Sequence, residues 1–142
     1  MKRLKIILLR TGLLTILLLP LYMCSNEESR LEQKWQMRQI IRTDGNIQVM
    51  DSLFYNFMDG TFSSIGVLPS GGYESCNGTY TLSGDELSIR IIPQDTMKLK
   101  GNPFRYMQWE DPSQSKQFRI SLLNSSSLRL VSGEYTFVFR KY

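Results

Sequence analysis

The clearest indication of the fold is the stretch at residues 53–67, which reads LFYNFMDGTFSSIGV. Apolar and polar residues alternate on both sides of Asp59-Gly60, as in two half-buried strands. Asp-Gly favours a two-residue type I′ turn, because both turn positions need positive φ. The inward-facing pairs of the resulting hairpin are Phe57 with Phe62, Tyr55 with Ser64 and Leu53 with Gly66. A slip of one residue would turn this face to solvent, so the register is well specified.

Further hairpins are expected along the chain. Their turns lie at Asp44-Gly45-Asn46, which suits a three-residue loop with a bulge, at Ser83–Glu86 and at Ser132-Gly133. The predicted inward pairs are Ile41 with Val49, Met37 with Leu53, Trp35 with Tyr55, Leu82 with Leu87, Tyr80 with Ile89, Gly78 with Ile91, Leu130 with Tyr135 and Leu128 with Phe137. Another alternating strand carries Phe118, Ile120 and Leu122. No segment keeps a helical apolar period over three turns.

Strands and turns of this spacing predict an all-β domain. About eight strands joined mostly by tight antiparallel turns favour a single up-and-down barrel, because closure removes the exposed sheet edges. The polar segment Pro93–Ser115 interrupts the pattern and is expected to form a long loop.

The N-terminus has the pattern of an export signal. Residues 1–23 carry four basic residues and then the apolar run Leu13–Leu19. This run is shorter than the roughly 20 residues that a membrane-spanning helix needs, so cleavage is expected. Leu21-Tyr22-Met23-Cys24 resembles a lipobox, which implies that Cys24 carries a lipid. The alternative is a plain cleaved signal in which Cys24 has no role.

The chain is thus divided into a signal peptide (1–23), a lipidated cysteine with a polar linker (24–33) and a barrel domain (34–142). Residues 25–29, Ser-Asn-Glu-Glu-Ser, resemble a short acidic signal that directs lipoproteins to the outer face of the outer membrane. They could equally serve as a solvated spacer. We expect an outer-membrane lipoprotein of the cell envelope, held to the membrane by its lipid and facing either the cell surface or the periplasm.

Charge argues against a nucleic-acid partner. The net charge of +4 resides in the signal, because without its four basic residues thirteen basic residues face thirteen acidic ones. The neutral remainder has no basic stripe to neutralise a phosphate backbone.

The residue types also limit the chemistry. The chain contains no histidine, which removes Ser-His-Asp and Cys-His nucleophile systems and histidine zinc sites. Cys76 is the only cysteine beyond Cys24, and its strand parity with Gly78 and Tyr80 predicts an inward, unreactive thiol. We expect no catalytic residue, no metal, no cofactor and no enzyme activity.

Several motifs together resemble the lipocalin-like domains of lipoproteins from Gram-negative bacteria. They are Trp35, the FMDGTF hairpin at residues 57–62, GTYTLSGDEL at 78–87 and YTFVFR at 135–140. The resemblance implies a closed barrel that binds a small hydrophobic or amphipathic ligand. It also implies that Trp35 packs at one end of the barrel against a basic residue near the last strand, Arg140 or Lys141.

The candidate ligand site is the aromatic inner face, with Tyr55, Phe57, Phe62, Tyr80, Tyr135 and Phe137. Residues 93–115 would then form a lid. Alternatively, a filled barrel would serve as a protein-interaction or envelope-assembly module and would contact an envelope protein through Phe104, Tyr106, Met107 and Trp109. A third interpretation is that this loop simply folds over one barrel end.

Overall fold

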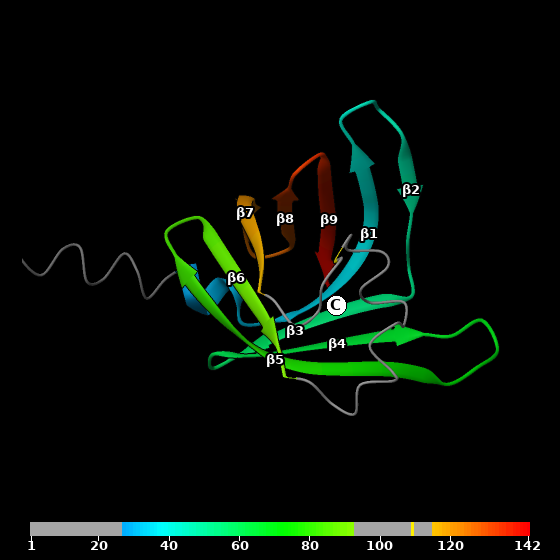
Figure 1. The fold of residues 1–142 in the computed structure, drawn as a ribbon, viewed down its shortest axis with the longest axis horizontal. Coiled ribbons are helices and arrows are strands. Elements are labelled where there is room, and N and C mark those ends of the chain that lie inside the picture. Colours follow the sequence, from blue (N-terminus) through cyan, green and yellow to red (C-terminus); the bar gives the residue numbers. More distant parts are fainter. Residues whose placement is uncertain (1–26, 93–108, 110–114) are drawn as a thin grey trace, which may run out of the picture.

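The computed structural model describes residues 27–92, 109 and 115–142. Its strands are β1 (Lys34–Arg42), β2 (Ile47–Val49), β3 (Leu53–Met58), β4 (Thr61–Val67), β5 (Tyr73–Ser83), β6 (Glu86–Ile91), β7 (Lys116–Leu123), β8 (Ser127–Ser132) and β9 (Tyr135–Lys141). They follow the order β2-β1-β3-β4-β5-β6-β7-β8-β9, and β1 also pairs with β9, which closes the sheet (Figure 1). Because β2 and β3 pair with successive parts of β1, the result is the predicted closed, eight-stranded antiparallel barrel.

The connections alternate between the two ends of the barrel, as antiparallel neighbours require. One end, here called the capped end, carries a helical turn at residues 27–31 and the strand connections at 59–60, 84–85 and 124–126. The other, here called the open end, carries the connections at 43–46, 68–72 and 133–134. In Figure 1 the blue helical turn lies beside the β5–β6 turn, and the β1–β2 hairpin projects from the opposite side.

The hairpin predicted at residues 53–67 is confirmed. Asp59 and Gly60 have φ of 50° and 73°, as a type I′ turn requires. Phe57 pairs with Phe62, and the other two predicted pairs of this hairpin are also present. The β5–β6 register is likewise as predicted over all three pairs. In both hairpins the turn residues and the alternating pattern point to the same register.

The predicted β8–β9 register is wrong by two residues. Leu130 pairs with Phe137 rather than with Tyr135, and Leu128 pairs with Phe139. The turn contains only residues 133 and 134, so Ser132 and Tyr135 already face each other. The turn is as short as predicted but lies one residue later in the chain, and Phe139, which now faces Leu128, is 1% exposed in the core.

The β1–β2 register also differs by two residues from the prediction. Ile41 pairs with Ile47 rather than with Val49, whereas Trp35 pairs with Tyr55 as expected. The β1–β3 ladder ends before the predicted Met37–Leu53 pair. Residues 50–52 belong to neither β2 nor β3, which allows these two strands to pair with β1 in different registers.

Two bulges reverse the inward parity of their strands. The first lies between Met37 and Gln39 in the β1–β9 pairing, so Ile40 and not Ile41 joins the core. The second lies between Ile120 and Leu122 in the β7–β8 pairing, and Leu123 instead of Leu122 packs against the core. The predicted inward positions of Ile41 and Leu122 are therefore wrong.

The helical turn packs against the barrel, so residues 27–33 are not the solvated linker that was expected for this part of the chain. Leu31 is fully buried, and its carbonyl oxygen accepts a hydrogen bond from Trp35 Nε1 at 2.9 Å. Glu32 Oε1 accepts a bond from the backbone N–H of Asp59 at 2.9 Å. Apolar burial and these bonds hold the turn across the barrel end. The proposed lipid site, Cys24, lies outside the described residues.

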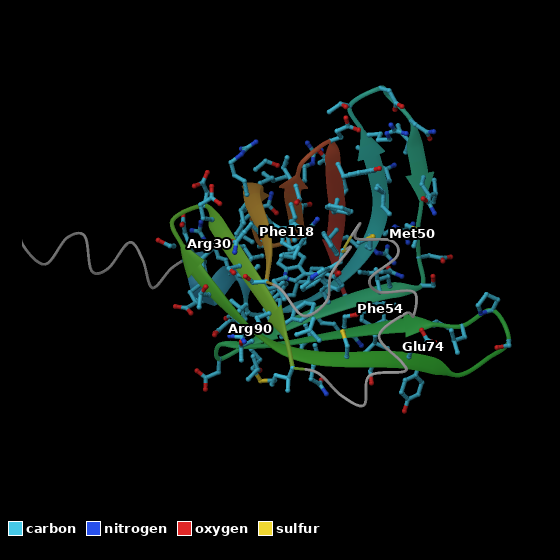
Figure 2. The ribbon with its side chains drawn as sticks, viewed as in Figure 1. Arg30, Met50, Phe54, Glu74, Arg90 and Phe118 are labelled. Carbon is cyan, nitrogen blue, oxygen red and sulfur yellow. The ribbon has the colours of Figure 1, made fainter. Side chains whose placement is uncertain are left out.

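The core fills the space that the strands enclose. Its buried apolar side chains come from every strand except β2, and Phe118 on β7 is among the most deeply buried (Figure 2). Within the described part of the chain, no helix has the length and hydrophobicity to span a membrane.

Candidate ligand-binding site

Four of the predicted interior aromatic residues fill the barrel towards the capped end. The ring centroids of Tyr55 and Phe62 are 4.8 Å apart, those of Phe57 and Tyr80 5.2 Å, and those of Phe57 and Phe62 5.3 Å. All four residues are at most 4% exposed. Edge-on and tilted packing at these distances is typical of aromatic cores. This half of the interior is therefore occupied by the protein's own side chains.

The hydroxyl of Tyr80 helps to close the capped end. It donates a hydrogen bond to Glu32 Oε1 at 3.3 Å. Burial raises the pKa of Tyr80 to about 12. Tyr80 thus links the aromatic cluster to the segment that covers it and stays protonated at neutral pH.

Tyr135, the predicted aromatic residue nearest the open end, is only partly buried. It begins β9 and stacks on Phe137 beneath it, with 25° between the rings and 6.2 Å between the centroids. Phe137 is fully buried. The two rings therefore lead from the open end into the core.

A cavity of about 220 Å³ adjoins these rings at the open end; we call it the open-end cavity. Its lining residues are Ile40, Arg42, Asn46, Gln48 and Tyr135. The pairs Ile40–Gln48 and Arg42–Tyr135 place these side chains on the inner face of β1, β2 and β9. Ile40 is 6% exposed and forms an apolar floor, whereas the remaining lining residues form a polar and aromatic rim.

The charge at this rim is balanced. The guanidinium of Arg42 lies 3.6 Å from a carboxylate oxygen of Asp44 and 3.6 Å from one of Glu134. All three side chains are well exposed, so these ion pairs contribute little to stability. The rim offers hydrogen-bond donors and acceptors without a strong preference for one sign of charge.

Three buried polar side chains lie side by side on the inner face of β3, β4 and β5. Ser64 on β4 pairs with Tyr55 on β3 and with Cys76 on β5, and all three are buried. Burial raises the pKa of the Cys76 thiol, and the nearby Ser64 offsets part of this effect. Burial likewise raises the pKa of Tyr55 well above its usual value. The inward orientation predicted for Cys76 is confirmed, and its thiol is free.

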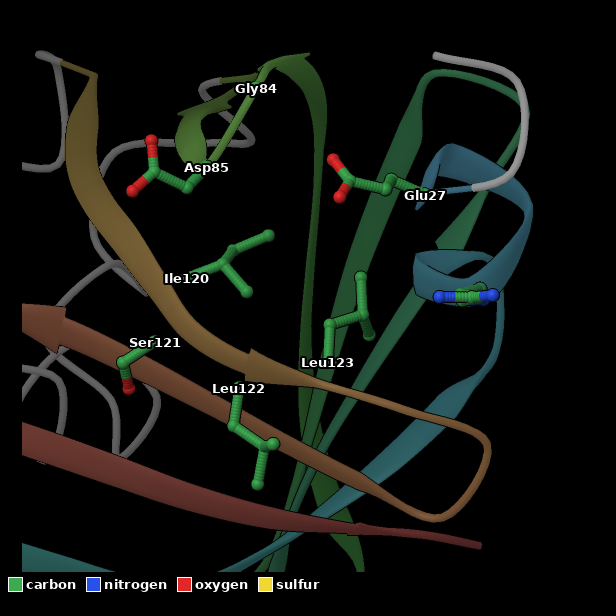
Figure 3. Close-up of a pocket in the computed structure, with 8 residues that line it drawn as sticks. Glu27, Gly84, Asp85, Ile120, Ser121, Leu122 and Leu123 are labelled. Carbon is green, nitrogen blue, oxygen red and sulfur yellow. The ribbon is translucent and has the colours of Figure 1, made fainter. Parts of the chain in front are cut away.

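A second cavity, of about 150 Å³, lies at the capped end (Figure 3). It lies between the helical turn, the β5–β6 turn and β7. Its lining residues are Glu27, Arg30, Gly84, Asp85, Ile120, Ser121, Leu122 and Leu123. Leu123 and Ile120 close it towards the core, so it is separated from the open-end cavity by the packed interior.

Trp35 and Arg140 do not form the predicted pair. Trp35 is fully buried and bonds to the Leu31 carbonyl, as described above. Arg140 is exposed and lies opposite Gln36, whose Oε1 accepts a hydrogen bond from Arg140 Nε at 2.8 Å. Neighbouring residues of a strand point to opposite faces, so Arg140 is on the outer face while Trp35 points inward.

Trp109 does not form part of an exposed contact patch. It is 7% exposed and belongs to the hydrophobic core, which corrects the expected interaction surface at this residue. Removing the large apolar indole from water stabilises the fold, which explains why this side chain is buried and not exposed as expected. Phe104, Tyr106 and Met107, like most of the expected lid, lie outside the described residues.

Within the described ranges, no group of three or more His, Cys, Asp or Glu side chains is placed to hold a metal ion.

Four residues that line the open-end cavity were not predicted from the sequence. They are Ile40, Arg42, Asn46 and Gln48. Their common signal is alternation along the β1–β2 hairpin, and the bulge after Met37 conceals it.

The chain matches the model of the lipocalin-like domain family over residues 17–142. It is similar to a lipocalin-like protein from Bacteroides uniformis ATCC 8492, with 34% identity, a TM-score of 0.70, and coverage of 80% of this chain and 99% of the other. An uncharacterized protein from Bacteroides eggerthii DSM 20697 has 30% identity and a TM-score of 0.66, with 78% and 98% covered. No match was found among curated proteins. The chain belongs to the lipocalin-like domain family.

Proposed function

We propose that this protein is a lipid-anchored lipoprotein of the cell envelope whose barrel binds a small hydrophobic or amphipathic ligand without transforming it. The open-end cavity carries the proposal, because an apolar floor lies beneath a polar rim. An apolar cavity of about 150 Å³ can hold benzene, whereas sites for drug-sized ligands are roughly 300–1,000 Å³. At about 220 Å³, the open-end cavity suits one ring or a short chain. The lipocalin-like fold is consistent with binding of this kind.

A non-catalytic role is favoured by the side chains available. The chain lacks histidine, and the free thiol of Cys76 is buried with a raised pKa. Asp85 and Glu86 are exposed at the β5–β6 turn, so neither lies in the enclosed, apolar surroundings in which carboxyl groups act as general acids. The rim of the open-end cavity can orient a polar group of a ligand by hydrogen bonds alone.

A lipid on Cys24 would also orient the barrel. Cys24 lies three residues before the start of the helical turn at Glu27. Three extended residues span at most about 11 Å. The capped end would therefore lie next to the membrane and the open end would face away from it, accessible from the aqueous side. Outer-membrane attachment, exposed to either the cell surface or the periplasm, is part of the proposal.

Metabolic labelling with radioactive palmitate tests the anchor. We expect the wild-type chain to incorporate label in a Gram-negative host and Cys24→Ala to lose it. Cys76→Ser, the control, should remain labelled. Label that persists in Cys24→Ala would rule out this attachment site.

Ligand binding is best tested with the soluble chain 25–142. Every described strand and buried contact lies within it, so it contains the complete barrel. The probe is benzyl alcohol, a single ring with one polar group, and its binding is measured by isothermal titration calorimetry. We expect saturable binding that Tyr135→Asp weakens at least tenfold, because a carboxylate would replace a lining ring. The matched control is Tyr73→Asp, at a 73% exposed position on β5. Equal loss in both variants, or none in Tyr135→Asp, would contradict a site at the open end.

A further inference from the structure

The outer face of the barrel separates charges that balance over the sequence. Strands β7, β8, β9 and β1, which lie side by side in Figure 1, contain eight basic residues and no acidic residue. The basic residues are Lys34, Arg38, Arg42, Lys116, Arg119, Arg129, Arg140 and Lys141. The charged residues of the remaining strands are Glu74, Glu86 and Arg90. One side of the barrel is therefore positive, although the chain after residue 23 is neutral.

Five of these basic side chains form an outward-facing surface, here called the basic wall. Each lies next to a buried core residue in its strand and therefore points to the outer face. The members are Lys34, Arg38, Arg119, Arg129 and Arg140. None of them forms an ion pair with a carboxylate of the described residues. Glu86, which faces Arg119 from β6, lies at the margin of the wall.

The strand register brings three members of the basic wall together. Ser127 pairs with Arg140, so Arg129, two residues further along β8, is a diagonal neighbour of Arg140. Val131 pairs with Arg119, which makes Arg119 and Arg129 neighbours in the same way. Diagonal neighbours are about 7–8 Å apart, within reach of long side chains. The guanidinium groups of β7, β8 and β9 thus form one diagonal row.

Gln36 holds two guanidinium groups of the basic wall next to each other. Its Oε1 accepts a hydrogen bond from Arg140 Nε at 2.8 Å and another from Arg38 Nη1 at 3.5 Å. Gln36 is 6% exposed, so this acceptor is fixed in the sheet. Like charges that are held side by side repel each other, and an anionic partner would remove that cost.

Aromatic rings lie beside the basic wall. Lys34 Nζ is 5.2 Å from the ring centroid of Phe54 and 4.7 Å from that of Tyr142, which is 66% exposed. Tyrosine is enriched at the boundary of membrane and water, because its ring is apolar and its hydroxyl is polar. Lys34 and Tyr142 therefore combine a cation with a ring that suits the headgroup region of a bilayer.

The basic wall begins at the capped end of the barrel. Lys34 starts β1 at this end, and Arg140 lies one residue before β9 finishes there. Cys24, proposed above to carry the lipid, is three residues from Glu27 at the same end. An anchored barrel would therefore hold this part of the wall close to the lipid headgroups.

We propose that the basic wall docks on an anionic lipid surface, where its Lys and Arg side chains contact the phosphates of the headgroups. The proposal rests on the lipid anchor proposed above and adds the face of the barrel that touches the membrane. Contact along β8, β9 and β1 would tilt the barrel towards these strands and leave Tyr135, at the open end, in water. The open-end cavity would then remain accessible to a ligand.

Vesicle co-sedimentation of the soluble chain 25–142, which carries no lipid, tests the wall itself. The vesicles consist of equal parts of phosphatidylcholine and phosphatidylglycerol, or of phosphatidylcholine alone. We expect binding to the anionic vesicles only, with release at high salt. Arg129→Gln and Arg140→Gln should each lower the partition coefficient roughly fivefold, the effect of one basic residue at the surface. The matched control, Arg90→Gln on β6, removes the same charge outside the wall and should lower it less than about twofold.

Three results would overturn the proposal. They are no binding to anionic vesicles, an equal loss in Arg129→Gln and Arg90→Gln, and capture by immobilised heparin without vesicle binding. The second would mean that net charge alone attracts the chain, and the third would assign the wall to an acidic polymer. Palmitate labelling and binding of benzyl alcohol do not depend on the wall, so its failure would leave the proposed function standing. Conversely, label that persists in Cys24→Ala would reject that anchor site without changing the vesicle result.

Discussion

Replacing Leu31 with alanine should strongly destabilise the barrel, although this residue precedes the first strand. Leu31 is fully buried in the core at the capped end. Leu→Ala substitutions in cores cost about 2–5 kcal/mol, because apolar contacts are lost and a cavity remains. We expect about 3 kcal/mol, since the turn that carries Leu31 is also fixed through Trp35 Nε1 and Glu32.

Urea unfolding of the soluble chain, followed by tryptophan fluorescence, measures this cost. With an m value of roughly 1–3 kcal/mol per M, a loss of about 3 kcal/mol lowers the midpoint by about 1 M or more. The matched control is Leu122→Ala, because Leu122 is only half-buried and lies outside the core cluster. It should cost below about 1 kcal/mol. A change within about 0.5 kcal/mol for Leu31→Ala would mean that residues 27–33 are a linker after all.

Three other predictions concern the barrel wall. Gly78→Ala should cost about 3 kcal/mol or more in thermal or urea unfolding, because the new Cβ would overlap Arg90 O; a loss no larger than that of exposed Thr79→Ala would refute this crowding. Stability should fall as the pH rises from about 10 to about 12, because unfolded tyrosine ionises first while folded Tyr80 stays protonated; Tyr80→Phe should reduce this slope, and an unchanged slope would contradict the assignment. The Cys76 thiol should react with a disulfide reagent only after unfolding in urea, and rapid labelling of the native chain would show that it is accessible.

The parts of the fold that could be predicted are those in which turn residues and alternation agree locally. Asp59-Gly60 specifies its own turn geometry, and the flanking pairs follow from it. The β8–β9 register could not be fixed in this way, because a shift of two residues keeps the same side chains inward. Leu130 faces the core whether it pairs with Tyr135 or with Phe137, so the pattern does not distinguish the two registers.

Bulges and long-range packing account for the remaining differences. The bulge between Met37 and Gln39 moves Ile40 inward, and no local residue type announces it. Part of the open-end cavity was therefore missed, although Tyr135 was among the predicted site residues. Burial of Trp109 depends on contacts with the distant core, and such contacts leave no trace in the residues around it.

The central claim is that the barrel carries a small ligand, and native mass spectrometry tests it most directly. The soluble chain 25–142 would be incubated with a lipid and metabolite extract of the cell envelope and then sprayed under gentle conditions, beside Tyr135→Asp. The account predicts one reproducible added mass on the wild type that disappears on denaturation and is reduced in the variant. A clean apo mass across extracts and concentrations, or an adduct unchanged by Tyr135→Asp, would contradict it.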